Sequence, residues 1–140
     1  MSDFDLNAFN AGIVEEFRAK DGNVTGMFEG APMVLITHTG ARTGQLRTTP
    51  LVHTIDGGRV IIIASMGGAP TNPAWFHNIK ANPRVTVELG GETFEAEAEI
   101  LTEGAERQRL FDQQAELMPN FKQYQEKTDR VIPVVALSRI

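Results

Sequence analysis

Two arginines and two threonines lie close together in THTGARTGQLRTTPL, residues 37–51. Arg42 and Thr43 fall in a glycine-flanked turn, and Arg47 and Thr48 begin the segment after it, so we expect all four at one end of a hairpin. Guanidinium groups, hydroxyls and free backbone N–H groups bind phosphate and carboxylate. The stretch therefore predicts an anion site, although the same pattern is also typical of a hairpin turn without a ligand.

The positive charge is concentrated in one part of an acidic chain. The formal net charge is −5, yet residues 30–87 contain five basic residues and the single acid Asp56, a balance of +4 that leaves −9 elsewhere. Sequence-independent nucleic-acid binding usually needs a basic protein, so we expect no nucleic-acid partner. A segregated basic stretch favours a local anion site.

The loop SMGGAP, residues 65–70, is a second candidate site. It follows an apolar run and precedes a predicted short helix, and its glycines allow the backbone to approach a flat ligand closely. It is not a P-loop, and no Gly-x-Gly-x-x-Gly pattern is present. A flexible connection, with Trp75 and Ile79 as the core face of the short helix, is an equally compatible interpretation.

Other chemistries find little support. The chain has no cysteine, which excludes disulfides, thiolate zinc sites and a cysteine nucleophile. His38, His53 and His77 lack metal-binding spacing, so no metal is expected; His38 and His53 could face each other across a hairpin as a structural pair. No Gly-x-Ser-x-Gly elbow occurs. The alternating glutamates of residues 92–99 are typical of a solvated strand face.

Hydrophobic periodicity predicts one α+β, mainly β domain over residues 1–140. Segment 1–22 should hold an amphipathic helix at 5–20. Further helices are expected at 73–81, capped by Asn72, at 103–117 and at 119–128. Six strands are expected, and they suggest a mostly antiparallel barrel, closed or nearly closed, with helices outside. These strands cover residues 33–39, 46–55, 59–65, 84–90, 92–101 and 130–137.

The sequence predicts a cytoplasmic protein. Its N-terminus lacks a basic segment followed by an apolar block, and its apolar runs are far shorter than the roughly 20 residues of a membrane span. The N-terminal helix is compatible with capping the barrel, pairing with another chain or peripheral contact with a membrane. Both a monomer and a homodimer are compatible with the sequence.

Three segments resemble a known family: LITHTGARTGQLRTTPLV, VIIIASMGGAPTNPAWFHNIKANPRVTVELGG and YQEKTDRVIPVV. In order and spacing they are similar to the deazaflavin-dependent nitroreductases, which include quinone reductases that use coenzyme F-420. That family has a split β-barrel like that of FMN-binding pyridoxamine-phosphate oxidases. The resemblance implies hydride transfer from reduced F-420 to a small electrophilic acceptor: a quinone, a nitroaromatic or an α,β-unsaturated carbonyl compound.

The resemblance also implies site residues. Ser65 and Tyr124 would act in catalysis by donating hydrogen bonds, or a proton in the case of Tyr124, to the developing oxyanion. Phe121 and Tyr124 would contact the acceptor, and Phe121, where the family has a further tyrosine, implies a different acceptor preference. Met66 replaces a lysine common in the family, which removes one positive charge. The cofactor-binding residues implied are Arg42, Thr43, Arg47 and Thr48 for the phosphate, Pro50 beside the cofactor, Ile63, Ala64, Ser65, Met66, Gly67 and Gly68 for the ring and its side chain, and Trp75 and Asn78 over the ring.

Two alternatives remain open. The same barrel could hold F-420 or another anionic ligand, such as a fatty acid, for storage or delivery without catalysis. It could also belong to an FMN-binding split-barrel oxidoreductase. An enzyme needs an open acceptor site next to the ring, and an FMN protein would purify yellow.

Overall fold

A single curled antiparallel sheet organises the chain. The computed structural model describes residues 6–26 and 29–140. Residues 1–5, part of the predicted N-terminal helical segment, lie outside the described residues. The elements are α1 (Leu6–Ala19), β1 (Met33–Thr39), β2 (Leu46–Val52), β3 (Thr54–Asp56), β4 (Arg59–Ile63), the short 3-10 helix η2 (Met66–Gly68), α2 (Ala74–Ala81), β5 (Arg84–Leu89), β6 (Glu92–Leu101), α3 (Ala105–Leu117), α4 (Asn120–Glu126) and β7 (Val134–Arg139).

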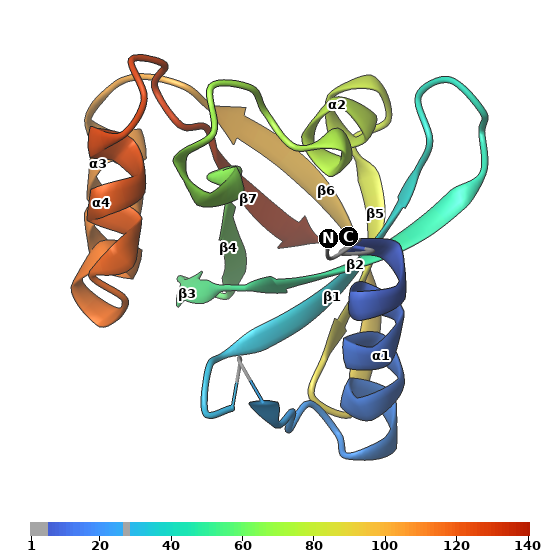
Figure 1. Cartoon of the computed structure of the whole chain (residues 1–140). Coiled ribbons are helices and arrows are strands. Elements are labelled where there is room, and N and C mark those ends of the chain that lie inside the picture. Colours follow the sequence, from blue (N-terminus) through green and yellow to red (C-terminus); the bar gives the residue numbers. More distant parts are fainter. Residues whose placement is uncertain (1–5, 27–28) are drawn as a thin grey trace, which may run out of the picture.

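The strands follow the order β2-β1-β5-β6-β7-β4-β3. Every neighbouring pair is antiparallel, and the sheet curls into a half-barrel with helices on its outside and one helix, α2, at its open end (Figure 1). The predicted α+β, mainly β fold is confirmed. Within the described residues β2 and β3 form the two edges of the sheet, which suits Pro50 because proline cannot donate to a ladder.

The number of strands predicted from the sequence, six, is wrong, because the chain changes its partner strand at His53. Residues before His53 pair with β1, whereas Thr54–Asp56 pairs with β4. The His53 backbone N–H donates to the Pro32 carbonyl at 3.0 Å and the ring Nδ1 lies 3.0 Å from the same oxygen. His38 and His53, which could have faced each other across a hairpin, do not, since the ladder places Arg47 opposite His38.

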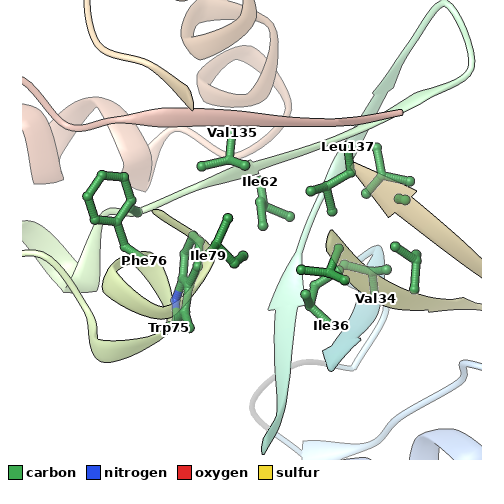
Figure 2. Packing of buried hydrophobic residues seen from close by; sticks show 13 residues of the cluster. Val34, Ile36, Ile62, Trp75, Phe76, Ile79, Val135 and Leu137 are labelled. Atoms are coloured by element: carbon green, nitrogen blue, oxygen red, sulfur yellow. The ribbon is translucent and has the colours of Figure 1, made fainter. Parts of the chain in front are cut away.

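The interior of the half-barrel is apolar. Trp75, Phe76 and Ile79 of α2 point towards the sheet and pack with Ile62 and Val135, as Figure 2 shows. Burial of such large side chains stabilises the fold by about 1.5–3 kcal/mol each. This contact fixes α2 over the open end of the sheet.

The outer faces of the sheet are covered by the other helices. Ile13 and Phe17 of α1 pack with Met33 and Leu35 of β1. The apolar face of α1 therefore covers the outside of the β1–β2 hairpin. On the far side, α3 and α4 bury a second group of side chains against β4 and β7. It comprises Leu110, Phe111, Phe121, Ile61, Ile63, Ile132, Val134 and Ala136.

Among the described residues, none of the helices combines the length and apolar composition that a bilayer crossing requires.

Candidate functional site

The basic turn between β1 and β2 is a tight, internally bonded loop. Gly40 N–H donates to Gln45 O at 2.7 Å, and Gly44 N–H donates to Gly40 O at 2.9 Å. The Thr43 hydroxyl accepts from Gln45 N–H at 3.2 Å. A side chain at Gly40 would meet that hydroxyl at 2.7 Å. The predicted turn is confirmed, and it holds the Arg42 backbone in place.

Arg42 and Arg47 differ from the other arginines of the chain. Both side chains are exposed, and within the described residues neither makes a hydrogen bond or an ion pair. An exposed guanidinium without a protein partner is free to bind an external anion. Every other arginine is bonded to a carboxylate or amide oxygen of the chain: Arg18, Arg59, Arg84, Arg107, Arg109, Arg130 and Arg139.

Strand alternation divides the predicted phosphate-binding residues. Arg47 lies opposite His38 in the ladder, on the inner face, whereas Thr48 lies opposite Thr37 on the α1 face. The Thr48 hydroxyl is 2.8 Å from that of Thr37, and Thr48 lines a recess of about 450 Å³ beside α1. Pro50 shares the face of Thr48. The structure brings Arg42, Thr43 and Arg47 to the end of the hairpin and does not bring the Thr48 side chain there.

A chain of three hydrogen bonds connects α2 to the basic turn. The Ala41 backbone N–H donates to Asn78 Oδ1 at 2.9 Å, and Asn78 Nδ2 donates to His38 Nδ1 at 3.0 Å. His38 Nε2 lies 2.9 Å from Thr49 Oγ1. Since the backbone N–H fixes the orientation of the amide, His38 Nδ1 must accept and Nε2–H must donate. Asn78, expected over the cofactor ring, therefore has both amide atoms engaged in holding the turn.

His38 is kept neutral by its surroundings. The side chain is 3% exposed, and burial, reinforced by the positive charge of Arg47, lowers its pKa to about 4. The effect of the Arg47 charge on the pKa of His38 agrees with the ladder, which places Arg47 on the same face of the sheet as His38. A neutral imidazole is the form that the Asn78 hydrogen bond requires.

The loop after β4, residues 64–72, begins with the buried residues Ala64 and Ser65. Ile63 and Ala64 belong to two different hydrophobic clusters on opposite faces of the sheet, so their side chains are packed within the protein. Ser65 is 9% exposed, and its hydroxyl has no hydrogen-bond partner among the described residues. Met66 follows with φ +47° and is 52% exposed. A positive φ at a non-glycine residue is strained, and such strain gathers at functional sites.

The role of Arg130 was missed by sequence reasoning. Its guanidinium donates to the carbonyls of Ala64, Ser65 and Ala69 and to Asn72 Oδ1. The predicted helix cap at Asn72 is wrong: Pro73 is the N-cap of α2, and the Asn72 amide oxygen accepts from Arg130 at 2.7 Å. A charged donor forms a stronger hydrogen bond than a helix-end N–H does. No local pattern around Arg130 indicates this contact.

Tyr124 and Phe121 lie on α4. Asn120 Nδ2 donates to the Tyr124 hydroxyl at 2.7 Å, which leaves the hydroxyl proton of Tyr124 available to another acceptor. Phe121 is only 4% exposed and packs edge-to-face with Tyr124, with 5.3 Å between ring centroids. Phe121 thus supports Tyr124 and offers almost no surface of its own.

The 64–72 loop and α4 approach each other closely. A side-chain atom at Gly68 would meet the Tyr124 carbonyl at 2.7 Å, and Gly68 has φ +85°. Glycine is therefore required there. In Figure 1, α2 lies between this loop and the basic hairpin, so both candidate segments border the same helix.

These residues fit an anionic, planar cofactor. Two guanidinium groups and a serine hydroxyl lack a partner among the described residues; the guanidinium groups suit its phosphate, and the hydroxyl, in a glycine-containing loop, suits the edge of a ring. Within the described part of the chain, no group of histidine, aspartate and glutamate side chains is arranged to hold a metal ion.

Comparisons with known proteins agree with the three matching sequence segments. The family described as F-420H(2)-dependent quinone reductase matches residues 12–139. A quinone reductase of that description from Mycobacterium tuberculosis is 40% identical over 126 residues, which cover 88% of this chain and 85% of the relative. The structure of an F-420-H2 dependent reductase, FDR-A, is 41% identical, covers 76% of this chain and 94% of its own, and superimposes with a TM-score of 0.71. A structure described as a domain-swapped dimer is 36% identical, with coverage of 94% and 96% and a TM-score of 0.73.

Proposed function

Because this chain belongs to the F-420H(2)-dependent quinone reductase family, we propose that it reduces quinones with coenzyme F-420. The observation that carries the proposal is the unpaired state of Arg42 and Arg47 within the described residues. Two free cations in an acidic protein suit the phosphate and acidic tail of that cofactor. FMN, the alternative cofactor, is not supported by the family match.

Different residues would bind the anionic part of the cofactor and its ring. Arg42, Thr43 and Arg47 would bind the anionic part of the cofactor, while the Asn78–His38 pair holds their turn. The backbone of Ile63 to Gly68 would border the ring, with Trp75 of α2 beside it. When bound in its reduced form, the cofactor supplies a hydride, which is two electrons and one proton, and a second proton completes the hydroquinone.

The hydroxyls of Ser65 and Tyr124 are available to assist the step in which the second proton is added. Each can donate a hydrogen bond to an oxygen that becomes negative after hydride transfer. The Asn120 amide would stabilise the phenolate if Tyr124 gave up its proton. Thr48 and Pro50 would act only by shaping the strand, since they face α1.

The acceptor class and the assembly are part of the proposal. Quinones come first because the family name specifies them, with nitroaromatics and enones as further acceptors to be measured. The relative described as a domain-swapped dimer favours a homodimer, and light scattering of the purified protein would establish the assembly. Vesicle flotation would show whether α1 adds peripheral membrane contact.

The deciding experiment is an anaerobic titration with reduced F-420, and separately with FMN, followed by the quinone menadione. We expect F-420 to bind, menadione to oxidise it rapidly, and FMN to bind poorly. Binding of F-420 without oxidation by any acceptor would favour a storage or delivery barrel. Preferential binding of FMN would overturn the proposal.

A further inference from the structure

Arg130 makes more hydrogen bonds to one loop than any other arginine among the described residues. Its Nε donates to Ala69 O at 2.9 Å and its Nη1 to Asn72 Oδ1 at 2.7 Å. Its Nη2 donates to Ser65 O at 3.0 Å and to Ala64 O at 3.3 Å. One side chain therefore connects both ends of the 64–72 loop.

The partners of Arg130 are all neutral. They are backbone carbonyls and one amide oxygen, with no carboxylate among its contacts in the described residues. By contrast, Arg109 pairs with the carboxylate of Asp56. A planar fork that is bonded at Nε, Nη1 and Nη2 fixes the geometry of its acceptors, which a flexible ammonium group does not do.

Arg130 is itself held in place by α4. Gln125 Nε2 donates to Arg130 O at 2.7 Å, while Gln125 Oε1 accepts from Ile132 N–H at 3.0 Å and from Arg107 Nη2 at 2.8 Å. These bonds connect α3, α4 and the segment before β7. Because these bonds fix the backbone of Arg130, its guanidinium group restrains the loop to which it donates.

The loop needs such a restraint. Met66 and Gly68 both have positive φ, and Met66 is strained in this conformation. Ser65, whose hydroxyl has no hydrogen-bond partner in the part of the chain that the structure describes, lies between this strained residue and the end of β4. Without Arg130, the carbonyls of Ala64, Ser65 and Ala69 would lose their charged donor, and the loop would gain other conformations of similar energy.

We propose that Arg130 is a positioning residue that holds the 64–72 loop, and with it Ser65, in the conformation that receives the cofactor ring. The inference rests on the proposed function, because it assigns a role at the same site. It adds a residue that lies outside both candidate segments and acts through the loop backbone.

The test compares Arg130→Met, which removes charge and fork, with Arg130→Lys, which keeps the charge alone. We expect hydrogen exchange of residues 64–72 in the cofactor-free protein to rise in both variants. The dissociation constant for reduced F-420 should rise about 10-fold or more in Arg130→Met, with only partial rescue by lysine. The KM for the cofactor should rise more than kcat falls. The lysine variant also covers the case in which Arg130→Met does not fold.

Arg109→Met is the matched control, because Arg109 makes several hydrogen bonds with its guanidinium group, to Asp56 and not to the loop. It should leave loop exchange and cofactor affinity at wild-type values. The inference would be overturned if Arg130→Met kept the wild-type hydrogen exchange of the loop and the wild-type affinity for F-420. It would also be overturned if Arg109→Met lost as much affinity and loop protection as Arg130→Met. Failure of the proposed function looks different: the wild-type protein would then not bind F-420, while loop exchange in Arg130→Met would still rise.

Discussion

Asn78 Nδ2 donates a hydrogen bond to His38 Nδ1 across 3.0 Å and so connects α2 to β1. The other amide atom of Asn78 accepts from Ala41, next to Arg42. The position of an exposed cation therefore depends on the protonation state of a buried imidazole. A proton on Nδ1 would place two donors face to face and break the bond.

Acidification should destabilise the protein through His38. Its folded pKa of about 4 lies below the ordinary 6.5, so the unfolded chain takes up the proton first as the pH falls. The free energy of unfolding should decrease from about pH 6.5 downwards and level off below about pH 4. Urea unfolding across this range should show a shallower dependence on pH in His38→Gln.

His77→Gln is the control for that measurement, because His77 is an exposed histidine on α2. It leaves the contacts of His38 in place, so the loss of stability that His38 causes should persist in this variant. His53 remains in both variants, and burial lowers its pKa too, so part of the acid sensitivity will persist. An identical pH dependence in His38→Gln and wild type would contradict the prediction.

Neutralising the basic turn should weaken cofactor binding. Arg42→Gln and Arg47→Gln should each raise the dissociation constant for F-420 about 10-fold or more at low ionic strength. Added salt should narrow the difference, because it screens exposed charges. Fluorescence titration at low and high salt measures both effects. Arg139→Gln, an exposed arginine that pairs with Glu92, is the control and should bind normally.

Removing the Tyr124 hydroxyl should slow turnover without changing cofactor affinity. Tyr124→Phe should lower kcat with menadione about 10-fold or more, since a donor to the developing oxyanion is lost. Asn120→Ala keeps the hydroxyl and loses only its amide partner, so its effect should have the same direction and be smaller. Wild-type turnover of every quinone by Tyr124→Phe would exclude the role.

Gly68 and Gly58 form a matched pair for testing the contact between the 64–72 loop and α4. Their φ angles are +85° and +84°, but a side chain at Gly58 meets open space and one at Gly68 meets the Tyr124 backbone. Gly58→Ala should cost about 1 kcal/mol of unfolding free energy from backbone strain alone. Gly68→Ala should cost about 1–3 kcal/mol more, and it alone should change the KM for the quinone. Equal losses of stability in Gly58→Ala and Gly68→Ala, measured by thermal unfolding, would mean that the contact of Gly68 with the Tyr124 backbone is unimportant.

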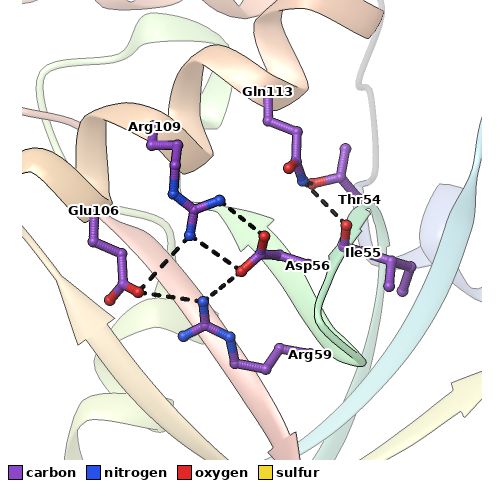
Figure 3. A network of polar contacts seen from close by, with 7 residues as sticks. All are labelled: Thr54, Ile55, Asp56, Arg59, Glu106, Arg109 and Gln113. Atoms are coloured by element: carbon purple, nitrogen blue, oxygen red, sulfur yellow. Dashed lines mark hydrogen bonds and ion pairs between the residues drawn. The ribbon is translucent and has the colours of Figure 1, made fainter.

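Asp56 connects the β3–β4 hairpin to α3. Its carboxylate accepts from Arg109 at 2.9 Å and from Arg59 at 2.6 Å, while Glu106 completes the group (Figure 3). Hydrogen bonds from Arg109 and then Arg59 hold the pKa of Asp56 well below its usual range. This stability is present above the ordinary pKa of aspartate and is lost as the pH falls below it.

Asp56→Asn should therefore lower the unfolding midpoint at neutral pH and reduce the loss of stability below about pH 4. High salt should shrink the difference from wild type. Denaturant unfolding at two pH values measures it. Glu92→Gln, which breaks a single exposed pair with Arg139, should have a smaller effect. A larger effect at that control would contradict the importance of the network.

The locations of the two candidate segments follow from the sequence alone. The glycine-flanked basic turn, the glycine loop after a buried strand and the short helix with Trp75 depend on local spacing, which turn chemistry and periodicity describe. The alternation rule also separates Arg47 from Thr48, a consequence that the expectation of four converging side chains overlooked. The roles of individual site residues remain predictions.

Tertiary structure decided which of these groups are free. Asn78 is occupied by Ala41 and His38, Asn72 is taken by Arg130, and Arg42 has no partner among the described residues. The partners in these contacts lie 37 to 58 residues apart in the chain, so no local pattern specifies them. The break at His53 also involves a contact between distant residues, because the His53 backbone N–H donates to the Pro32 carbonyl, 21 residues away, whereas β3 itself pairs with β4 in a local hairpin. Sequence placed the charges, and the long-range hydrogen bonds determined which of them can bind a ligand.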